Sequence, residues 1–139
     1  MDGISALIQT NGNADCHLIL RGGDNGPNYD SQSIGKAVRS MADQGLPEAV
    51  MIDASHGNSN KDYRRQSVVC DSVCGSIEQG MPILGVMLES HLQEGRQECG
   101  PLETLKYGIS VTDSCISWET TVILLEKIAL ANKNRKQAS

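Results

Sequence analysis

The sequence has no phenylalanine, and aromatic residues make up only 3% of its 139 positions. A hydrophobic core built from this chain must therefore be aliphatic. The hydrophobic fraction of 39% is high enough to form such a core. The length suits a single domain of modest size, so we treat residues 1–139 as one unit.

Long apolar runs and blocks of one charge sign are also missing. No run approaches the roughly 20 residues that a membrane-spanning helix needs, so we expect no membrane span. The net charge of −5 is spread over acidic and basic residues, which argues against nucleic acid or an anionic membrane surface as a partner. The opening residues MDGISALIQT contain neither the basic nor the apolar region of a signal peptide.

The five cysteines are odd in number and lack the spacing of a disulfide framework. This pattern is typical of a reduced chain, and we expect a cytoplasmic location. Cys70 and Cys74 lie four positions apart on a predicted helix and share one face of it. We expect this pair to pack in the core rather than to bind a metal or act in redox chemistry.

Three compact apolar stretches are each followed by a stretch with helical periodicity. The predicted strands cover residues 16–20, 49–53 and 83–88, and a further short strand is expected over residues 4–10. The three main strands are near-continuous apolar runs, which favours an α/β fold with a parallel sheet covered on both faces. Apolar residues at helical spacing predict helices over residues 31–44, 63–79 and 117–132. Their expected buried stripes are Ile34, Val38 and Met41; Val69, Val73 and Ile77; and Trp118, Val122, Leu125 and Ala129.

Each predicted strand is followed by a residue that can take part in chemistry. Arg21 follows the first strand, His56 the second and Glu89 the third. Ligands of parallel α/β folds bind outside the carboxyl ends of the strands, so these side chains should face one shared binding site at that edge of the sheet. Asp113, in the long loop before the last helix, is a fourth candidate.

His56, Glu89 and Asp113 together offer the ligands of a divalent-metal site that suits Mn²⁺, Fe²⁺ or Zn²⁺ better than Ca²⁺. Arg21 stands beside two glycines, and its planar guanidinium suits a phosphate or carboxylate. Each residue alone has a structural alternative: a histidine in the fold, a solvated acid or an arginine in a turn. Two interpretations therefore stay open at this point, a metal-dependent α/β enzyme with an anionic substrate and a set of structural roles.

Further polar residues have less specific interpretations. We expect His17 to be structural and to point into the sheet or a helix layer. His91, two positions after Glu89, could support a site without binding a ligand itself. The basic residues Lys61, Arg64 and Arg65 are expected to form a solvated helix start, with an anion or partner contact as the alternative.

Five sequence blocks resemble the microbial class I 3-deoxy-D-arabino-heptulosonate 7-phosphate (DAHP) synthases. They are DCHLILRGG (15–23), PNY (27–29), MIDASHGNSNKDYRRQ (51–66), GVMLESHLQEG (85–95) and YGISVTDSCISWE (107–119), in the order of the family. The resemblance implies the C-terminal part, about three βα units, of a (β/α)₈ TIM barrel. It also implies the first step of the shikimate pathway, in which phosphoenolpyruvate condenses with erythrose 4-phosphate to give DAHP and phosphate.

The resemblance assigns His56, Glu89 and Asp113 to the divalent metal and Arg21 to the phosphate of phosphoenolpyruvate. The family's fourth metal ligand, a cysteine, has no counterpart among the five cysteines here. Because the family's chains are more than twice as long, we expect a portion of a synthase that has no activity by itself and that forms homo-oligomers when full length. The alternatives are a truncated chain that associates with a full-length synthase and a small self-associating metal-binding α/β protein.

Overall fold

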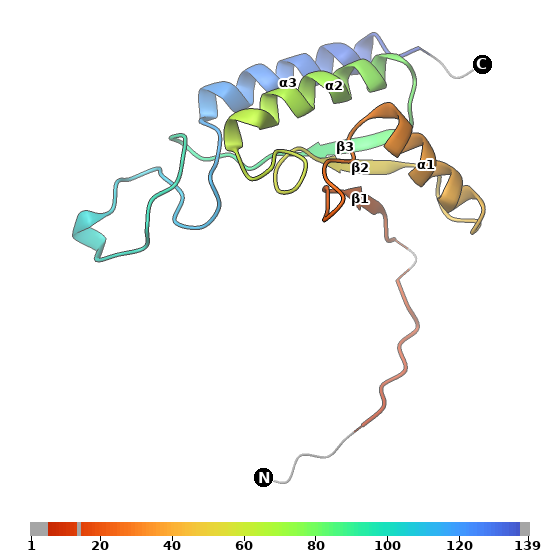
Figure 1. Ribbon diagram of the computed structural model, residues 1–139, viewed down its shortest axis with the longest axis horizontal. Helices are drawn as coiled ribbons and strands as arrows, with labels where there is room; N and C mark the ends of the chain where they lie inside the picture. Colours follow the sequence, from red (N-terminus) through yellow and green to blue (C-terminus); the bar gives the residue numbers. More distant parts are fainter. Residues whose placement is uncertain (1–5, 14, 137–139) are drawn as a thin grey trace.

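The computed structural model describes residues 6–13 and 15–136, and within them residues 18–133 form three successive strand–helix units (Figure 1). The three main strands and the three helices expected from the sequence are present, and their bounds lie close to the predicted ones. In chain order they are β1 (Leu18–Leu20), α1 (Ser31–Ala42), β2 (Val50–Asp53), a 3₁₀ turn (Tyr63–Arg65), α2 (Gln66–Glu78), β3 (Ile83–Met87), a second 3₁₀ turn (Leu102–Thr104) and α3 (Trp118–Lys133).

The three strands form one parallel sheet in the order β1-β2-β3. Leu20 pairs with Ile52, and Asp53 pairs with Met87. The carboxyl ends of all three strands therefore lie at the same edge of the sheet, as the prediction of a parallel α/β fold requires. None of the described helices is long and apolar enough to cross a membrane.

All three helices contribute to one core. Ile34 and Met41 of α1 belong to the same buried cluster as Val50 and Ile52 of β2, and the predicted α2 stripe joins them. Helices α2 and α3 lie side by side along the sheet (Figure 1). Cys70 is fully buried in this cluster and Cys74 packs against it, which confirms the expected core pair.

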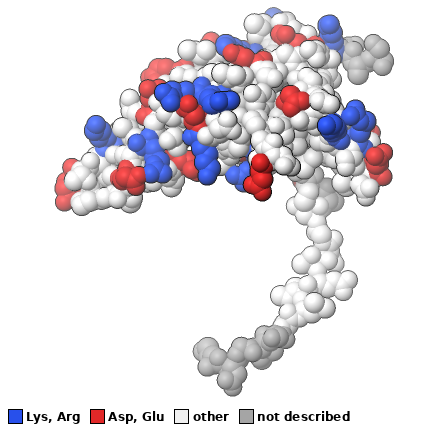
Figure 2. Space-filling view, in the orientation of Figure 1, with Lys and Arg blue, Asp and Glu red and all other residues white. Residues whose placement is uncertain are grey.

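The expectation that both faces of the sheet are covered is wrong for the described residues. The helices share a single core, while Ile19 of β1 and Leu84 of β3 stay 39% and 60% exposed. Apolar strands of this kind normally occur with cover on both faces. Figure 2 shows acidic and basic side chains interspersed over the visible surface of the folded part, with uncharged surface between them.

The predicted buried stripe of α3 is also wrong. Trp118 and Leu125 are 54% and 50% exposed, and the residues that α3 buries are instead Thr121, Leu124 and Ala131. Helix α3 is apolar on two adjoining flanks, so its periodicity cannot show which flank meets α2. The exposed flank forms, with β3 and the residues after it, an open groove, which we call the α3–β3 groove; it is lined by Val86, Leu88, Leu92, Trp118 and Leu125, among others.

Two expectations near the start of the chain differ from the structure. Residues 6–10 form no strand, and Leu7 and Ile8 are almost fully exposed; residues 4 and 5 lie outside the described part of the chain. His17 is exposed rather than packed in the sheet or a helix layer. An apolar pattern without a partner strand is not enough to form a strand, because the backbone groups need a neighbour to pair with.

Candidate metal centre

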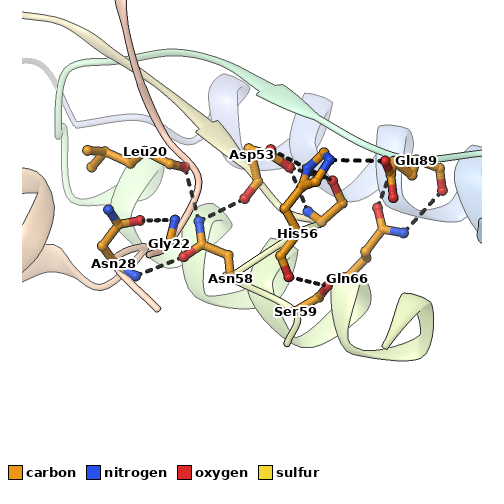
Figure 3. A network of polar contacts seen from close by, with 10 residues as sticks. Leu20, Gly22, Asn28, Asp53, His56, Asn58, Ser59, Gln66 and Glu89 are labelled. Carbon is orange, nitrogen blue, oxygen red and sulfur yellow. Dashed lines mark hydrogen bonds and ion pairs between the residues drawn. The ribbon is translucent and has the colours of Figure 1, made fainter. Parts of the chain in front are cut away.

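The loop after β2 places His56 at the carboxyl edge of the sheet (Figure 3). Asp53, the last residue of β2, is fully buried, and its Oδ1 accepts hydrogen bonds from the backbone N–H of Ser55 at 2.8 Å and from its hydroxyl at 2.6 Å. Its Oδ2 lies 2.7 Å from Nδ1 of His56. His56 has a φ of 46°, a left-handed conformation that is uncommon for a residue other than glycine. The local turn therefore aims the imidazole away from β2 and toward the neighbouring strand.

Asn58 ties the end of β1 to the end of β2 (Figure 3). Its buried amide donates to the carbonyl oxygens of Leu20 at 3.0 Å and Asp53 at 2.8 Å. Its carbonyl accepts from the backbone N–H of Asn28, whose own side-chain carbonyl accepts from the N–H of Gly22. These bonds satisfy backbone groups that the ends of a sheet would otherwise leave unpaired. They fix the two strand ends relative to each other.

Glu89 is positioned by a buried glutamine from the helix that precedes its strand. Gln66, the first residue of α2, donates to the carbonyl of Glu89 at 3.1 Å and accepts from its N–H at 2.9 Å. The carboxylate Oε1 of Glu89 lies 3.4 Å from Nε2 of His56. Burial raises the pKa of Glu89, the negative charges of Asp113 and Asp53 add to this, and His56 and Arg21 oppose it.

The long loop after β3 brings Asp113 to the same place. The backbone of Cys115 pairs with that of Gly95 at 2.8 and 3.1 Å, and the N–H of Ile116 donates to the carbonyl of Glu89 at 2.9 Å. As a result, one ligand atom each from His56, Glu89 and Asp113 lies within 4.8 Å of the others. His56 and Glu89 are half-buried and Asp113 is exposed, so the cluster stands at the mouth of a small pocket rather than in the core.

The spacing of this cluster suits a bound divalent ion. An imidazole nitrogen and two carboxylate oxygens are the donors that Mn²⁺, Fe²⁺ and Zn²⁺ accept. Two ligands that each stand about 2.1 Å from an ion at a tetrahedral angle are about 3.4 Å apart. The separation of 3.4 Å between His56 Nε2 and Glu89 Oε1 has this value. The residues present therefore fit a metal ion.

Arg21 stands at the same edge, directly after β1. Its carbonyl accepts a hydrogen bond from the N–H of Asn58 at 3.1 Å, and its charge contributes to the electrostatics of Glu89. Arg21 is exposed. The four predicted site residues thus lie on one edge of the sheet, although their roles as ligands stay predictions.

Of the other polar candidates, His91 and Arg64 lie outside the cluster, whereas Lys61 lies beside it. His91 is exposed, and its Nδ1 accepts from the N–H of Leu92 at 2.8 Å, so it does not join the cluster. Arg64 pairs with Asp62 at 2.9 Å on the surface, as expected for a solvated helix start. Lys61 is exposed and lines the pocket that holds the cluster.

Sequence reasoning missed three residues that hold the cluster in place: Asp53, Asn58 and Gln66. A carboxylate that ends an apolar strand three positions before His56 was a usable signal for Asp53. The partner that joins Asn58 to β1 is 38 residues away and that of Gln66 is 23 residues away, so no local pattern could identify these links.

The fold and the cluster define a class: an α/β protein with a parallel sheet and a candidate divalent-metal centre at the carboxyl ends of its strands. The model of the DAHP synthetase I family matches residues 2–126, and the chain belongs to this family. This agrees with the resemblance of its sequence blocks.

Curated relatives and a solved structure match nearly the whole chain. The Phe-sensitive phospho-2-dehydro-3-deoxyheptonate aldolase of Escherichia coli K12 is 48% identical over 96% of this chain and 38% of its own length. The tyrosine-inhibited enzyme of Schizosaccharomyces pombe is 44% identical over 97% of this chain and 38% of its own. The structure of the aldolase from Francisella tularensis SCHU S4 matches with a TM-score of 0.87 and 40% identity, over 94% of this chain and 38% of that one. The chain thus spans 38% of the length of these proteins.

Proposed function

We propose that this chain forms part of a DAHP synthase, which condenses phosphoenolpyruvate with erythrose 4-phosphate to give DAHP and phosphate. Membership of the family supports the reaction. The observation that carries the proposal is the convergence of ligand atoms from His56, Glu89 and Asp113 within 4.8 Å. A structural role alone gives no reason for these side chains to meet at the end of a sheet, where ligands of parallel α/β folds bind.

In this proposal the three residues bind a divalent ion, Mn²⁺, Fe²⁺ or Zn²⁺. A bound ion supplies Lewis-acid polarisation of a substrate carbonyl, here the aldehyde of erythrose 4-phosphate. His56 and Glu89 contribute ligands from rigid strand ends, and the long loop contributes Asp113. Arg21 binds the phosphate of phosphoenolpyruvate, because a guanidinium offers two parallel N–H donors to phosphate oxygens.

We further propose that the three strand–helix units are consecutive units of a (β/α)₈ TIM barrel, with residues 1–139 as the C-terminal portion. Three features support this: the parallel order of the strands, the helices on one face and the exposed apolar surface on the other. Three parallel strands cannot close a barrel, and both outer strands keep open edges. Further polypeptide would then be needed to complete the barrel, the ligand set and the oligomer, and residues 1–139 alone would be inactive.

The metal centre is tested by measuring Mn²⁺ binding to the native polypeptide that contains these residues, by electron paramagnetic resonance. His56→Ala, Glu89→Gln and Asp113→Asn should each weaken binding by more than about tenfold, since loss of a direct ligand should exceed the effect of a supporting residue. Asp62→Asn is the matched control, because this carboxylate pairs with Arg64 outside the cluster. Equal Mn²⁺ affinity in all four variants would overturn the assignment.

A second function rests on the α3–β3 groove and the open sheet edges. An exposed apolar groove beside unpaired strand edges favours association, either with a full-length synthase or between copies of this chain. Co-purification with a full-length synthase would support the first form of association. A stable oligomer of this chain that binds Mn²⁺ stoichiometrically would support the second. A monomer that binds neither partner would rule out both.

A further inference from the structure

We propose that Asp53 is a positioning residue, which fixes the orientation and the tautomer of His56 so that Nε2 faces the metal position with its lone pair free. The proposal rests on the proposed function in one respect, the role of His56 as a metal ligand. Asp53 itself is fully buried and does not belong to the cluster of ligand atoms. Its position is shown in Figure 3.

While the imidazole is neutral and Asp53 is ionised, only one arrangement of protons satisfies every atom around Asp53. An ionised carboxylate only accepts hydrogen bonds. Oδ1 accepts from the N–H and the hydroxyl of Ser55, and Oδ2 stands 2.7 Å from Nδ1 of His56. If the hydroxyl of Ser55 instead donated to Nδ1, which is 2.8 Å away, Nδ1 and Oδ2 would face each other as two acceptors. The proton of a neutral imidazole therefore belongs on Nδ1.

This tautomer has a consequence on the other side of the ring. With the proton on Nδ1, Nε2 is an acceptor, and it faces Oε1 of Glu89 at 3.4 Å. Two acceptors in contact are unfavourable unless a proton or a metal cation lies between them. The buried carboxylate of Asp53 on one side of the ring thus leaves Nε2 on the other side able to bind a cation. Histidine ligands of metals commonly donate their second ring N–H to a carboxylate in the same way.

The backbone of His56 restricts the ring in the same way. Its φ of 46° is held by the N–H of Lys61, which donates to the carbonyl of His56 at 2.8 Å, and by the hydroxyl of Ser59 at 3.3 Å. The backbone bonds fix where the side chain begins, and Asp53 fixes where the ring points. The backbone hydrogen bonds alone, or the bond to Asp53 alone, would not determine both where the imidazole lies and which nitrogen carries its proton.

The deciding variant is Asp53→Asn, which keeps the size of the side chain. Its carbonyl can still accept from Ser55, but its NH₂ then faces Nδ1 and needs an acceptor there. The ring should change to the tautomer with the proton on Nε2, which points that proton at the metal position. We expect Mn²⁺ affinity to fall by about 10- to 100-fold. Ser55→Ala is the matched control, because it removes a hydrogen bond from Asp53 but leaves the pairing with Nδ1.

The tautomer is read directly by ¹⁵N NMR of histidine in the metal-free native polypeptide, at a pH high enough for the imidazole to be neutral, with signals assigned through His56→Gln, His17→Gln and His91→Gln. A neutral His56 ring with its proton on Nδ1, which moves to Nε2 in Asp53→Asn but not in Ser55→Ala, is the expected result. A neutral ring with its proton on Nε2 would overturn the proposal, and the spectrum of the unmodified protein gives this answer even if Asp53→Asn does not fold.

The same measurements separate the two proposals. If His56 shows the expected tautomer but the unmodified protein binds no Mn²⁺, the proposed function fails and the role of Asp53 stands. If the unmodified protein binds Mn²⁺ and folded Asp53→Asn binds it equally well, the role of Asp53 fails and the metal centre stands.

Discussion

Gly57 lies so close to Gly22 that a Cβ on Gly57 would stand 2.9 Å from the carbonyl carbon of Gly22 and 2.9 Å from the carbonyl oxygen of Arg21. The loops after β1 and β2 thus meet backbone to backbone. Because Arg21 belongs to the first loop and His56 to the second, this contact sets the distance between the proposed phosphate site and the proposed metal site.

Gly57→Ala should therefore force the two loops apart. Overpacking of this kind costs about 1–3 kcal/mol in the free energy of unfolding, and Mn²⁺ binding should weaken with it. Gly23→Ala is the matched control in the same region, since its Cβ would meet nothing within 4 Å. Urea unfolding of both variants measures the difference. Equal stability of the two would show that the loops can separate without cost.

Replacement of Asn58 should loosen the same two strand ends. Asn58→Ala leaves the carbonyls of Leu20 and Asp53 without their donor, which costs about 1–3 kcal/mol for buried groups. Asn58→Asp, of equal size, should be at least as harmful at neutral pH because it places a carboxylate against those two carbonyls. Asn25→Asp, in an exposed loop, serves as control. If thermal unfolding shows Asn58→Asp to be as stable as the control, Asn58 does not hold the two strand ends together.

Helix α1 depends on its N-cap, Asp30, which accepts from the N–H of Ser33 at 2.9 Å and from its hydroxyl at 2.6 Å. Asp30→Ala should cost about 1 kcal/mol. The hydrogen bonds from Ser33 hold the pKa of Asp30 below its usual value, and the bond from the Ser33 hydroxyl contributes most. The stabilisation is therefore complete above the ordinary pKa and disappears as the pH falls through the lowered one.

The control for this prediction is Asp43→Ala at the other end of α1. A negative charge there opposes the helix dipole, so its removal should be neutral or slightly stabilising. Denaturant unfolding at pH 7 and pH 3 measures both variants. The gap between Asp30→Ala and the unmodified protein should narrow at pH 3, and a gap that is constant with pH would exclude a charged cap.

The thiol of Cys70 should be inert in the folded protein. Burial raises its pKa to about 12, with smaller contributions from Cys74 and Asp71. At pH 8 a thiol reagent should label the exposed Cys16 and Cys99 quickly and Cys70 only after unfolding. The raised pKa also lowers stability at high pH: the effect is absent below the unfolded pKa of about 8.5 and grows above it, because the unfolded state loses its proton first. Mass spectrometry of labelled peptides tests the prediction, and rapid labelling of Cys70 at pH 8 would contradict it.

Trp118, the one tryptophan of the sequence, reports on the α3–β3 groove. At 54% exposure its fluorescence in a preparation of residues 1–139 should peak near that of a solvated indole and be quenched by iodide. If further polypeptide covers the groove in the native protein, emission should shift to shorter wavelength and quenching should fall. Identical spectra would mean that the groove stays open. Trp118→Phe provides the background.

The three strands of the sheet and the residues of the candidate site could be predicted from the sequence because both depend on local patterns. Apolar runs mark the strands, and the carboxyl ends of parallel strands must meet, so His56 and Glu89 could be brought together without coordinates. The buried flank of α3 could not be predicted, since Trp118 and Leu124 are equally plausible core residues until the position of α2 is known. The supporting amides, Asn58 and Gln66, likewise each have a distant partner, Leu20 and Glu89, that only the fold brings near.

The pairing of Gln66 with Glu89 joins a helix directly to the candidate metal centre. Gln66 opens α2, and its side chain holds both backbone groups of Glu89. A displacement of the first turn of α2 must therefore carry Glu89 with it or break two hydrogen bonds at once. A movement of this end of α2 would therefore be transmitted to the proposed ligand Glu89 through these two hydrogen bonds, and not by way of the sheet.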